Sequence, residues 1–226
     1  MIRKWLIPPE QDAAYVAAME TVLDVYAQPY DPAHPVVCFD ECCKELHQLV
    51  RPTIQARDGE RVDAEYERHG MAPLHVWIEP RTGRMGVQAT ERRTSREFAE
   101  AIRTLVEAYP EAEQLTVVLD NLNTHRVAAL YAAFPATEAA RLRRRLTFVH
   151  TPKHASWLNM AELAISVLSR AVLKDQCFAT RTELETAVTD WVAARNTAPH
   201  PITWRFNVDR ARAKMPRVYP VVQPDK

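Results

Sequence analysis

The sequence predicts a mixed α/β fold in which helices cover a central sheet. Two patterns lead to this prediction. Short apolar runs typical of strands fill much of the first half of the chain, and longer stretches with apolar residues every three or four positions fill the second half. With 226 residues, of which 47% are hydrophobic, the chain is long enough for one large domain or a domain with an appendage.

A helix and a series of strands come first. Apolar residues at helical spacing predict a helix over 10–27, and the proline-rich segment 28–35 then acts as a linker. A polar stretch over 58–70 is expected to form a loop. Strands are expected on either side of this loop, at 36–40, 45–51, 73–79 and 84–90.

The second half of the predicted fold begins at Thr94. Thr94 and Glu97 have the spacing of a capping box, which predicts a helix that continues to about Ala108. The remaining elements, in order, are a strand at 115–120, helices near 124–133 and 136–145, a strand at 147–149, and helices near 157–174 and 180–195. This order, with the first three strands antiparallel, is that of the ribonuclease H-like architecture.

Composition narrows the class of protein. The chain has 29 basic and 29 acidic residues, so its net charge gives no support for a nucleic-acid partner. Four cysteines without a CxxC pair disfavour a disulfide scaffold and a zinc site, and indicate reduced thiols. No apolar stretch is long enough to cross a bilayer, and the first residues do not form a signal peptide. We therefore expect a cytoplasmic protein without a membrane partner.

Three acids stand where apolar residues are expected. Asp40 and Asp120 each close an apolar run, and Glu162 falls on the apolar side of the helix predicted after the N-cap residue Ser156, in its second turn. Each acid also has an ordinary interpretation, as a turn residue, a helix cap or the edge of an amphipathic stripe. Because unpaired buried charges are costly, the three carboxylates together predict a magnesium site suited to phosphate chemistry.

Polar residues beside these acids are candidates for a supporting role. Successive strand residues point to opposite faces, so only one of Asp40 and Glu41 can face a metal ion directly. Asp40 extends the apolar face of its strand, which leaves Glu41 as a residue behind the metal ligands. Asn121 and Asn159, which neighbour the other two acids, are expected to act in the same way.

Phosphate would be held by cationic side chains and metal. The chain has no GxxxxGK[ST], GxGxxG or HExxH motif and only four glycines, so a backbone phosphate cradle is not expected. Lys153, His154 and His125 lie near the predicted site in sequence and are candidate DNA contacts. A second candidate group precedes strand 147–149, although a basic run is equally often a solvated helix face; it consists of Arg141, Arg143, Arg144 and Arg145.

Three motifs carry a resemblance to a known family. They are Asp40-Glu41, the segment Leu119-Asp120-Asn121-Leu122-Asn123-Thr124-His125, and the segment Thr151-Pro152-Lys153-His154-Ala155-Ser156-Trp157-Leu158-Asn159-Met160-Ala161-Glu162. The third is the most specific. With the segments 66–70 and 197–204, these motifs resemble the transposases of the bacterial insertion-sequence six-thirty family, within the mariner superfamily, over nearly the whole chain.

The resemblance implies a DDE-type ribonuclease H-like nuclease and strand transferase that uses magnesium or manganese, with two ions expected. The family's catalytic and metal-binding triad falls on Asp40, Asp120 and Glu162. The implied partner is DNA, both the transposon ends and the target duplex, together with a second copy of the chain or a separately encoded helix-turn-helix subunit. The implied location is the bacterial cytoplasm, in association with the nucleoid.

These expectations divide the chain into three parts. Residues 1–35 would form an N-terminal helix and a linker to a missing DNA-binding region, 36–200 the catalytic domain, and 201–226 a basic tail. Two alternatives remain: a catalytically idle relic that only binds DNA or a partner, and a stand-alone ribonuclease H-like nuclease. The intact triad disfavours the first alternative, and the Ser156–Asn159 part of the third motif disfavours the second.

Overall fold

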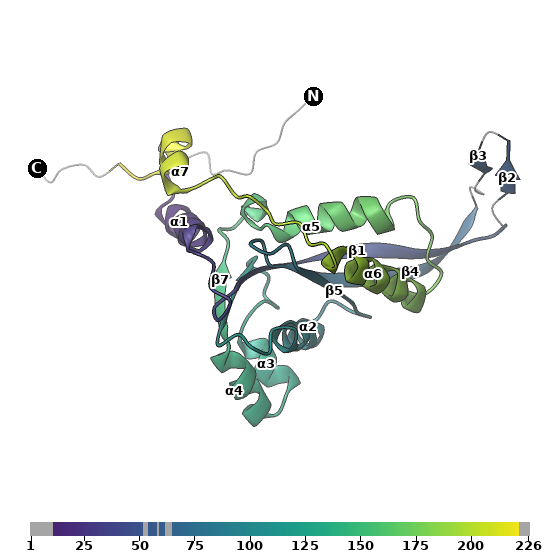
Figure 1. Cartoon of the computed structure of the whole chain (residues 1–226), viewed down its shortest axis with the longest axis horizontal. Helices are drawn as coiled ribbons and strands as arrows, with labels where there is room; N and C mark the ends of the chain where they lie inside the picture. Colours follow the sequence, from purple (N-terminus) through teal and green to yellow (C-terminus); the bar gives the residue numbers. More distant parts are fainter. Residues whose placement is uncertain (1–10, 52–53, 58, 62–64, 222–226) are drawn as a thin grey trace, which may run out of the picture.

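The chain folds around a five-stranded mixed sheet with helices on both faces (Figure 1). A computed structural model describes residues 11–51, 54–57, 59–61 and 65–221. The strand order is β5-β4-β1-β6-β7, in which β1, β4 and β5 are antiparallel while β6 and β7 run parallel to β1. The predicted fold class is therefore confirmed. The sheet strands are β1 Val36–Leu49, β4 Tyr66–Ile78, β5 Met85–Ala89, β6 Leu115–Leu119 and β7 Leu146–His150.

Two apolar cores lie on opposite faces of the sheet. The helices α2, α3 and α4 cover one face, and α5 and α6 cover the other (Figure 1). Alternate residues of β1 enter the two cores: Phe39 packs toward α2, whereas Cys38 packs toward α1 and α5. The helices are α1 Ala13–Ala27, α2 Ser95–Glu107, α3 Ala128–Ala133, α4 Ala136–Arg144, α5 Ala161–Leu168, α6 Arg181–Asn196 and α7 Val208–Lys214. None of the helices in the described ranges is long and apolar enough to cross a membrane.

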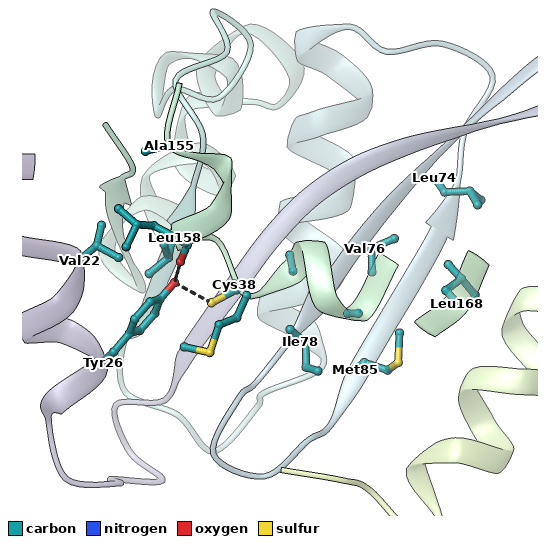
Figure 2. Close-up of a cluster of buried hydrophobic side chains, with 14 of the residues drawn as sticks. Val22, Tyr26, Cys38, Leu74, Val76, Ile78, Met85, Ala155, Leu158 and Leu168 are labelled. Carbon is teal, nitrogen blue, oxygen red and sulfur yellow. Dashed lines mark hydrogen bonds between the residues drawn. The ribbon is translucent and has the colours of Figure 1, made fainter. Parts of the chain in front are cut away.

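Helix α1 is tied to the sheet through Tyr26, which is buried in the apolar core on the α5 and α6 side of the sheet (Figure 2). The Tyr26 hydroxyl donates to the carbonyl oxygen of Leu158 at 2.7 Å and lies 3.3 Å from the Cys38 sulfur. Burial is the main reason why the pKa of the Cys38 thiol rises to about 12. Cys38 therefore acts as a neutral packing group.

The predicted helix starts at Thr94 and near residue 10 agree with the structure. Thr94 and Glu97 form both halves of the capping box of α2, and the Asp12 carboxylate accepts a hydrogen bond from the Tyr15 N–H at 2.9 Å to begin α1. The segment 201–226 contains α7, which contacts α1: the Arg212 side chain on α7 donates two hydrogen bonds to the Glu20 carboxylate on α1.

The first two predicted strands are one strand, which is a correction. β1 is continuous from Val36 to Leu49, with a bulge between Leu46 and His47, and β4 already begins at Tyr66. The two strands extend beyond the sheet as an arm whose tip carries the short strands β2 Ile54–Ala56 and β3 Gly59–Arg61 (Figure 1). Polar residues continue the strand here because the arm has no core to cover. The expected loop 58–70 is thus partly strand, and its residues 58 and 62–64 lie outside the described residues.

The predicted helix 157–174 is also broken up. It consists of a 3₁₀ turn, η1 Ser156–Leu158, then α5 and a π-helical turn, η2 Ser169–Leu173. Ser156 is not the N-cap of the helix. The regular helix starts later, at Ala161 with Met160 as its N-cap, so Glu162 lies in its first turn. The side chain of Asn159 accepts a hydrogen bond from the Ala161 N–H at 3.1 Å.

Candidate active site

The candidate site forms where β1 runs past the end of β6. The two strands pair only from Val36 to Cys38, so Asp40 lies just beyond their last residue pair. Asp120 directly follows Leu119, the last residue of β6. Because β1 and β6 are parallel, the two acids come to the same edge of the sheet. The start of α5 joins them there, since Asn159 contacts Asp40.

Asp40 is held in place by neutral donors. One carboxylate oxygen accepts the Glu41 N–H at 2.8 Å, and the other lies 3.3 Å from the Asn159 amide nitrogen, which also donates to the carbonyl oxygen of Phe39 at 2.8 Å. Burial, followed by repulsion from Glu162 and Asp120, raises the pKa of Asp40 to about 6. The Asn159 side chain therefore connects Asp40 to the start of α5.

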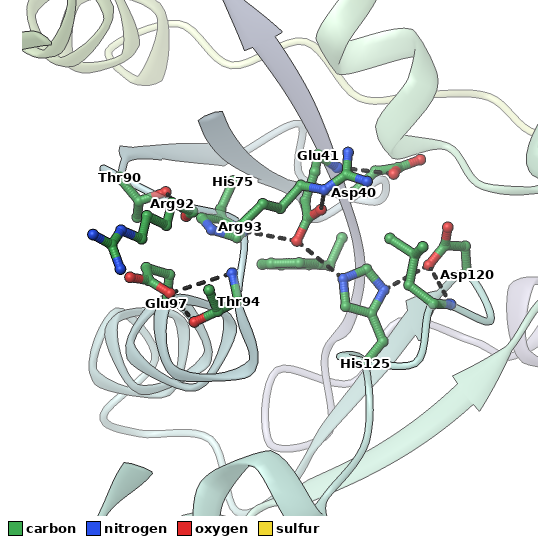
Figure 3. Close-up of polar contacts among 12 residues, drawn as sticks. Asp40, Glu41, His75, Thr90, Arg92, Arg93, Thr94, Glu97, Asp120 and His125 are labelled. Atoms are coloured by element: carbon green, nitrogen blue, oxygen red, sulfur yellow. Dashed lines mark hydrogen bonds and ion pairs between the residues drawn. The ribbon is translucent and has the colours of Figure 1, made fainter. Parts of the chain in front are cut away.

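Glu41 points to the opposite face of β1 and is enclosed by two histidines and an arginine (Figure 3). Its side chain is 2% exposed and lies 3.2 Å from His75 Nδ1, 3.1 Å from His125 Nε2 and 3.2 Å from Arg93 Nε. Burial alone would raise the pKa of Glu41, but the hydrogen bond with His125 and the contact with His75 outweigh it and lower the pKa to about 2. Glu41 is therefore the centre of a buried charged cluster behind Asp40.

His125 connects this cluster to Asp120. The His125 side chain is fully buried, and its Nδ1 lies 2.6 Å from the Asp120 carboxylate, which also accepts the Leu122 N–H at 3.1 Å. Burial opposes the charge on His125, yet its hydrogen bonds to Asp120 and Glu41 raise its pKa to about 9. The expectation that His125 contacts DNA is wrong, because a side chain with no exposed surface cannot reach a phosphate.

Glu162 lies on the solvent side of α5, not on its apolar side. Ala161, Ala164 and Leu168 form the buried face of the helix, and Glu162 is exposed. The apolar stripe predicted to contain Leu158 and Glu162 is not continuous, because Leu158 lies in the η1 turn and α5 begins only at Ala161. The Glu162 carboxylate is nevertheless near enough to raise the pKa of Asp40. Among the described residues, no three His, Cys, Asp or Glu side chains already form a group that could hold a metal ion.

A loop beside the acids presents Lys153 and His154 to solvent. The loop is fixed next to β6, because the Thr151 N–H donates to the carbonyl oxygen of Leu119 at 2.9 Å and the Asn121 side chain donates to the carbonyl oxygen of Thr151. His154 has a positive φ of 62°, which is uncommon for a residue other than glycine. Both cations are thus exposed at the edge of the sheet that carries Asp120.

The arginines of α4 lie elsewhere. α4 leads into the start of β7, whereas Asp120 follows the carboxyl end of the neighbouring strand β6. The five residues of β7 separate these two edges of the sheet by roughly 16 Å. Arg145 donates to the carbonyl oxygens of Tyr109 and Ala112 at 2.5 and 2.7 Å and therefore joins the end of α4 to the loop between α2 and β6. Arg141, Arg143 and Arg144 are exposed on α4, away from the edge of the acids.

The sequence alone did not identify His75 and Arg93. His75 is a member of the apolar run of β4 and is paired opposite Glu41 in the sheet, while Arg93 immediately precedes the capping box of α2. Neither has a sequence signal of its own. Only the strand register and the course of the loop after β5 bring them to Glu41.

A family model described as "DDE superfamily endonuclease" matches residues 35–185, which is well over half of the chain and includes all three acids. The chain belongs to this superfamily. No curated protein matches the sequence.

Solved structures of the Mos1 mariner transposase are similar in fold. The "paired end complex with Mn" has 14% sequence identity and a TM-score of 0.52, over 86% of this chain and 59% of that chain. The "Strand Transfer Complex" has 13% identity and a TM-score of 0.54, over 86% and 58%. The "paired end complex with Mg" has 15% identity and a TM-score of 0.53, over 87% and 59%. The DDE family member described here thus spans about three fifths of the length of these proteins.

Proposed function

We propose that this DDE superfamily protein is the catalytic portion of a transposase of the insertion-sequence six-thirty family, within the mariner superfamily. It would cleave DNA at transposon ends and join the freed ends to target DNA. The observation that supports this proposal is the meeting of Asp40, Asp120 and the charge of Glu162 at one edge of a ribonuclease H-like sheet, inside the matched family region.

The donor set fits a hard divalent cation. Carboxylate oxygens are the ligands preferred by magnesium and manganese. Burial, and after it repulsion from Glu162 and Asp120, raises the pKa of Asp40, and a bound cation would stabilise its charged form. Asp40, Asp120 and Glu162 would hold one or two such ions, which supply charge stabilisation at the attacking and leaving oxygens.

The residues of the chain would prepare this site. Asn159 orients Asp40, and His125 orients Asp120 through the 2.6 Å contact. Lys153 and His154, which are exposed, would contact phosphates beside the scissile bond. A water molecule would hydrolyse the phosphodiester at the transposon end and release a 3′-hydroxyl. That hydroxyl would then attack a phosphodiester of the target, forming a new phosphodiester and displacing the 3′-oxygen of the target strand. We propose that the chain acts in this way as a homodimer or with a separately encoded helix-turn-helix subunit.

The test is nicking of supercoiled DNA by the purified chain with magnesium or manganese. Glu162→Gln should abolish nicking, because the amide cannot supply the charge that holds an ion. Its melting temperature should stay within about 2 °C of the wild type, since the side chain is exposed. Glu185→Gln, at an exposed position on α6, is the matched control and should nick normally. Normal nicking by Glu162→Gln would refute the assignment, and a wild type inactive with both metals would favour the idle relic.

A further inference from the structure

The loop between β5 and α2 carries an arginine that the acid site itself does not explain. Arg93 reaches Glu41, the residue next to Asp40 on β1, with its Nε 3.2 Å from the buried carboxylate (Figure 3). Nearly half of the Arg93 side chain, 48%, is exposed. Within the described part of the chain, the Arg93 side chain makes no other hydrogen bond or ion pair. Its outer nitrogens are therefore available to a ligand.

Arg93 does not contact Glu41 in the way expected of an arginine that only neutralises a carboxylate. An arginine that serves only to pair a carboxylate usually binds it with two parallel hydrogen bonds. Arg93 approaches through Nε alone, and the Glu41 oxygen that it faces has no aligned hydrogen bond among the described residues. His75 and His125 already lie within 3.2 Å of the other Glu41 oxygen. The contact with Glu41 thus fixes the direction of Arg93 and leaves most of its donors unused.

The loop that carries Arg93 is fixed at both ends. The Thr90 N–H donates to the carbonyl oxygen of Pro73 at 2.9 Å, and the Thr90 hydroxyl donates to the carbonyl oxygen of Arg92 at 2.9 Å. On the other side, Thr94 closes the capping box with Glu97. A side chain held on such a loop loses little conformational entropy when it binds, which is the advantage of a preorganised contact.

The charge of the loop also favours an anion. Residues 90–96 contain three arginines and one acid, although the chain as a whole has no net charge. These four side chains, Glu91, Arg92, Arg93 and Arg96, are all exposed. The guanidinium group, with its planar set of donors, is well suited to a phosphate oxygen pair.

We propose that Arg93 binds a phosphodiester of the DNA strand at the acid site and that Glu41 is its positioning residue. This inference rests on the proposed function, which supplies the DNA substrate. It assigns the phosphate contact to the loop before α2 instead of the arginines of α4. Because Glu41 also holds His125, and His125 holds Asp120, one buried carboxylate connects the phosphate contact to a candidate metal ligand.

The test measures binding separately from cleavage. A labelled duplex is titrated with the wild type, Arg93→Gln, Arg93→Lys and Arg103→Gln in calcium, so that binding is observed without relying on turnover. Arg103 is a matched control: it is 36% exposed, is ion-paired to Glu138 at 3.7 Å, and lies ten residues farther along the chain on α2. We expect Arg93→Gln to lose on the order of tenfold in affinity and about one unit in the slope of log K against log salt, with Arg103→Gln unchanged. Arg93→Lys should retain the salt slope and part of the affinity.

The outcomes separate this inference from the proposed function. Equal affinity and salt slope for Arg93→Gln and the wild type would overturn the role of Arg93, whether or not the wild type cleaves DNA. If Arg93→Gln binds DNA more weakly and the wild type never cleaves DNA, the result would support the phosphate contact and count against catalysis. Where cleavage is observed, Arg93→Gln should need more DNA for half-maximal rate and keep most of the maximal rate; a fall in the maximal rate alone would contradict a binding role.

Discussion

Asp40 and Glu41 are neighbours on β1, yet the protein surrounds them in opposite ways. Glu41 faces the α2 side of the sheet and lies within 3.2 Å of two histidines and an arginine. Asp40 faces the α5 side, where its neighbours are amide groups and two further acids, and no cationic side chain of the described residues forms a salt bridge with it. Accordingly, the pKa of Glu41 falls to about 2 and that of Asp40 rises to about 6.

We propose that this difference separates a structural acid, Glu41, from a functional one, Asp40. The charge of Glu41 is balanced within the fold, so its contribution is to hold other groups in position. The charge of Asp40 is not balanced in this way, because burial and the other two acids both disfavour it. Perturbed acids without an internal partner are typical of functional sites. The two positions should therefore respond in opposite ways to neutralisation of the side chain.

The largest effect is expected for Asp40→Asn. This change should reduce metal-dependent nicking by roughly a thousandfold or more, because a lost metal ligand removes several kcal/mol of transition-state stabilisation. It should leave the free energy of unfolding unchanged or raise it by up to about 1 kcal/mol without metal, since it removes a disfavoured charge. Nicking assays and urea denaturation of the same preparation measure both. A variant that is less stable yet still nicks would identify Asp40 as a structural residue.

Glu41→Gln should show the reverse pattern. Removing one partner from a buried charged cluster leaves the others uncompensated, which typically costs about 3 kcal/mol. Arg93, His75 and His125 would lose their shared anion, and the urea midpoint should fall accordingly. Residual nicking, measured at a temperature where the variant is folded, should exceed that of Asp40→Asn. A variant as stable as the wild type would show that the histidines are neutral and that the cluster is not held by charge.

Strand alternation alone is sufficient to separate these two acids. It assigns Asp40 and Glu41 to opposite faces, because side chains alternate along a strand whatever its partners are. Strand alternation does not predict the partners of Glu41. His75 arrives through the register of β4, and Arg93 through a loop fixed by Thr90 and Thr94. Both depend on long-range pairing that the local sequence does not encode.

The prediction for Glu162 illustrates a second limit. The order of strands and helices follows from apolar spacing, and it predicts a mixed sheet flanked by helices and the strand that ends before Asp120, although it divides β1 into two strands. The apolar stripe expected around Glu162 requires one helix that begins near Ser156. The structure instead has a 3₁₀ turn over Ser156–Leu158 and an α-helix that begins only at Ala161, with Glu162 exposed. A shift of a few residues changes the exposed face of a helix, and helix ends are its least certain part. The resemblance carried by residues 151–162 does not depend on that phase.

The smallest effect is expected for an ion pair at the surface, where α1 meets α7. The Glu20 carboxylate accepts two hydrogen bonds from Arg212, at 2.9 and 3.0 Å, and one from the Tyr219 hydroxyl at 2.9 Å. The Arg212 side chain is 59% exposed, so water screens the pair far more than it screens Glu41 and its partners. Exposed ion pairs typically contribute under about 1 kcal/mol. Glu20→Gln should therefore lower stability far less than Glu41→Gln does.

This small difference should depend on pH. The hydrogen bond from Arg212 is the main cause of the lowered pKa of Glu20 in the folded protein. A lowered carboxyl pKa stabilises the fold above the ordinary value of 4.5, and that stabilisation is lost as the pH falls through the lower folded value. Urea midpoints of the wild type and Glu20→Gln should differ at neutral pH and approach each other in acid. A difference that stayed constant from neutral to acidic pH would mean that Glu20 acts through packing and the Tyr219 contact, and not through its charge.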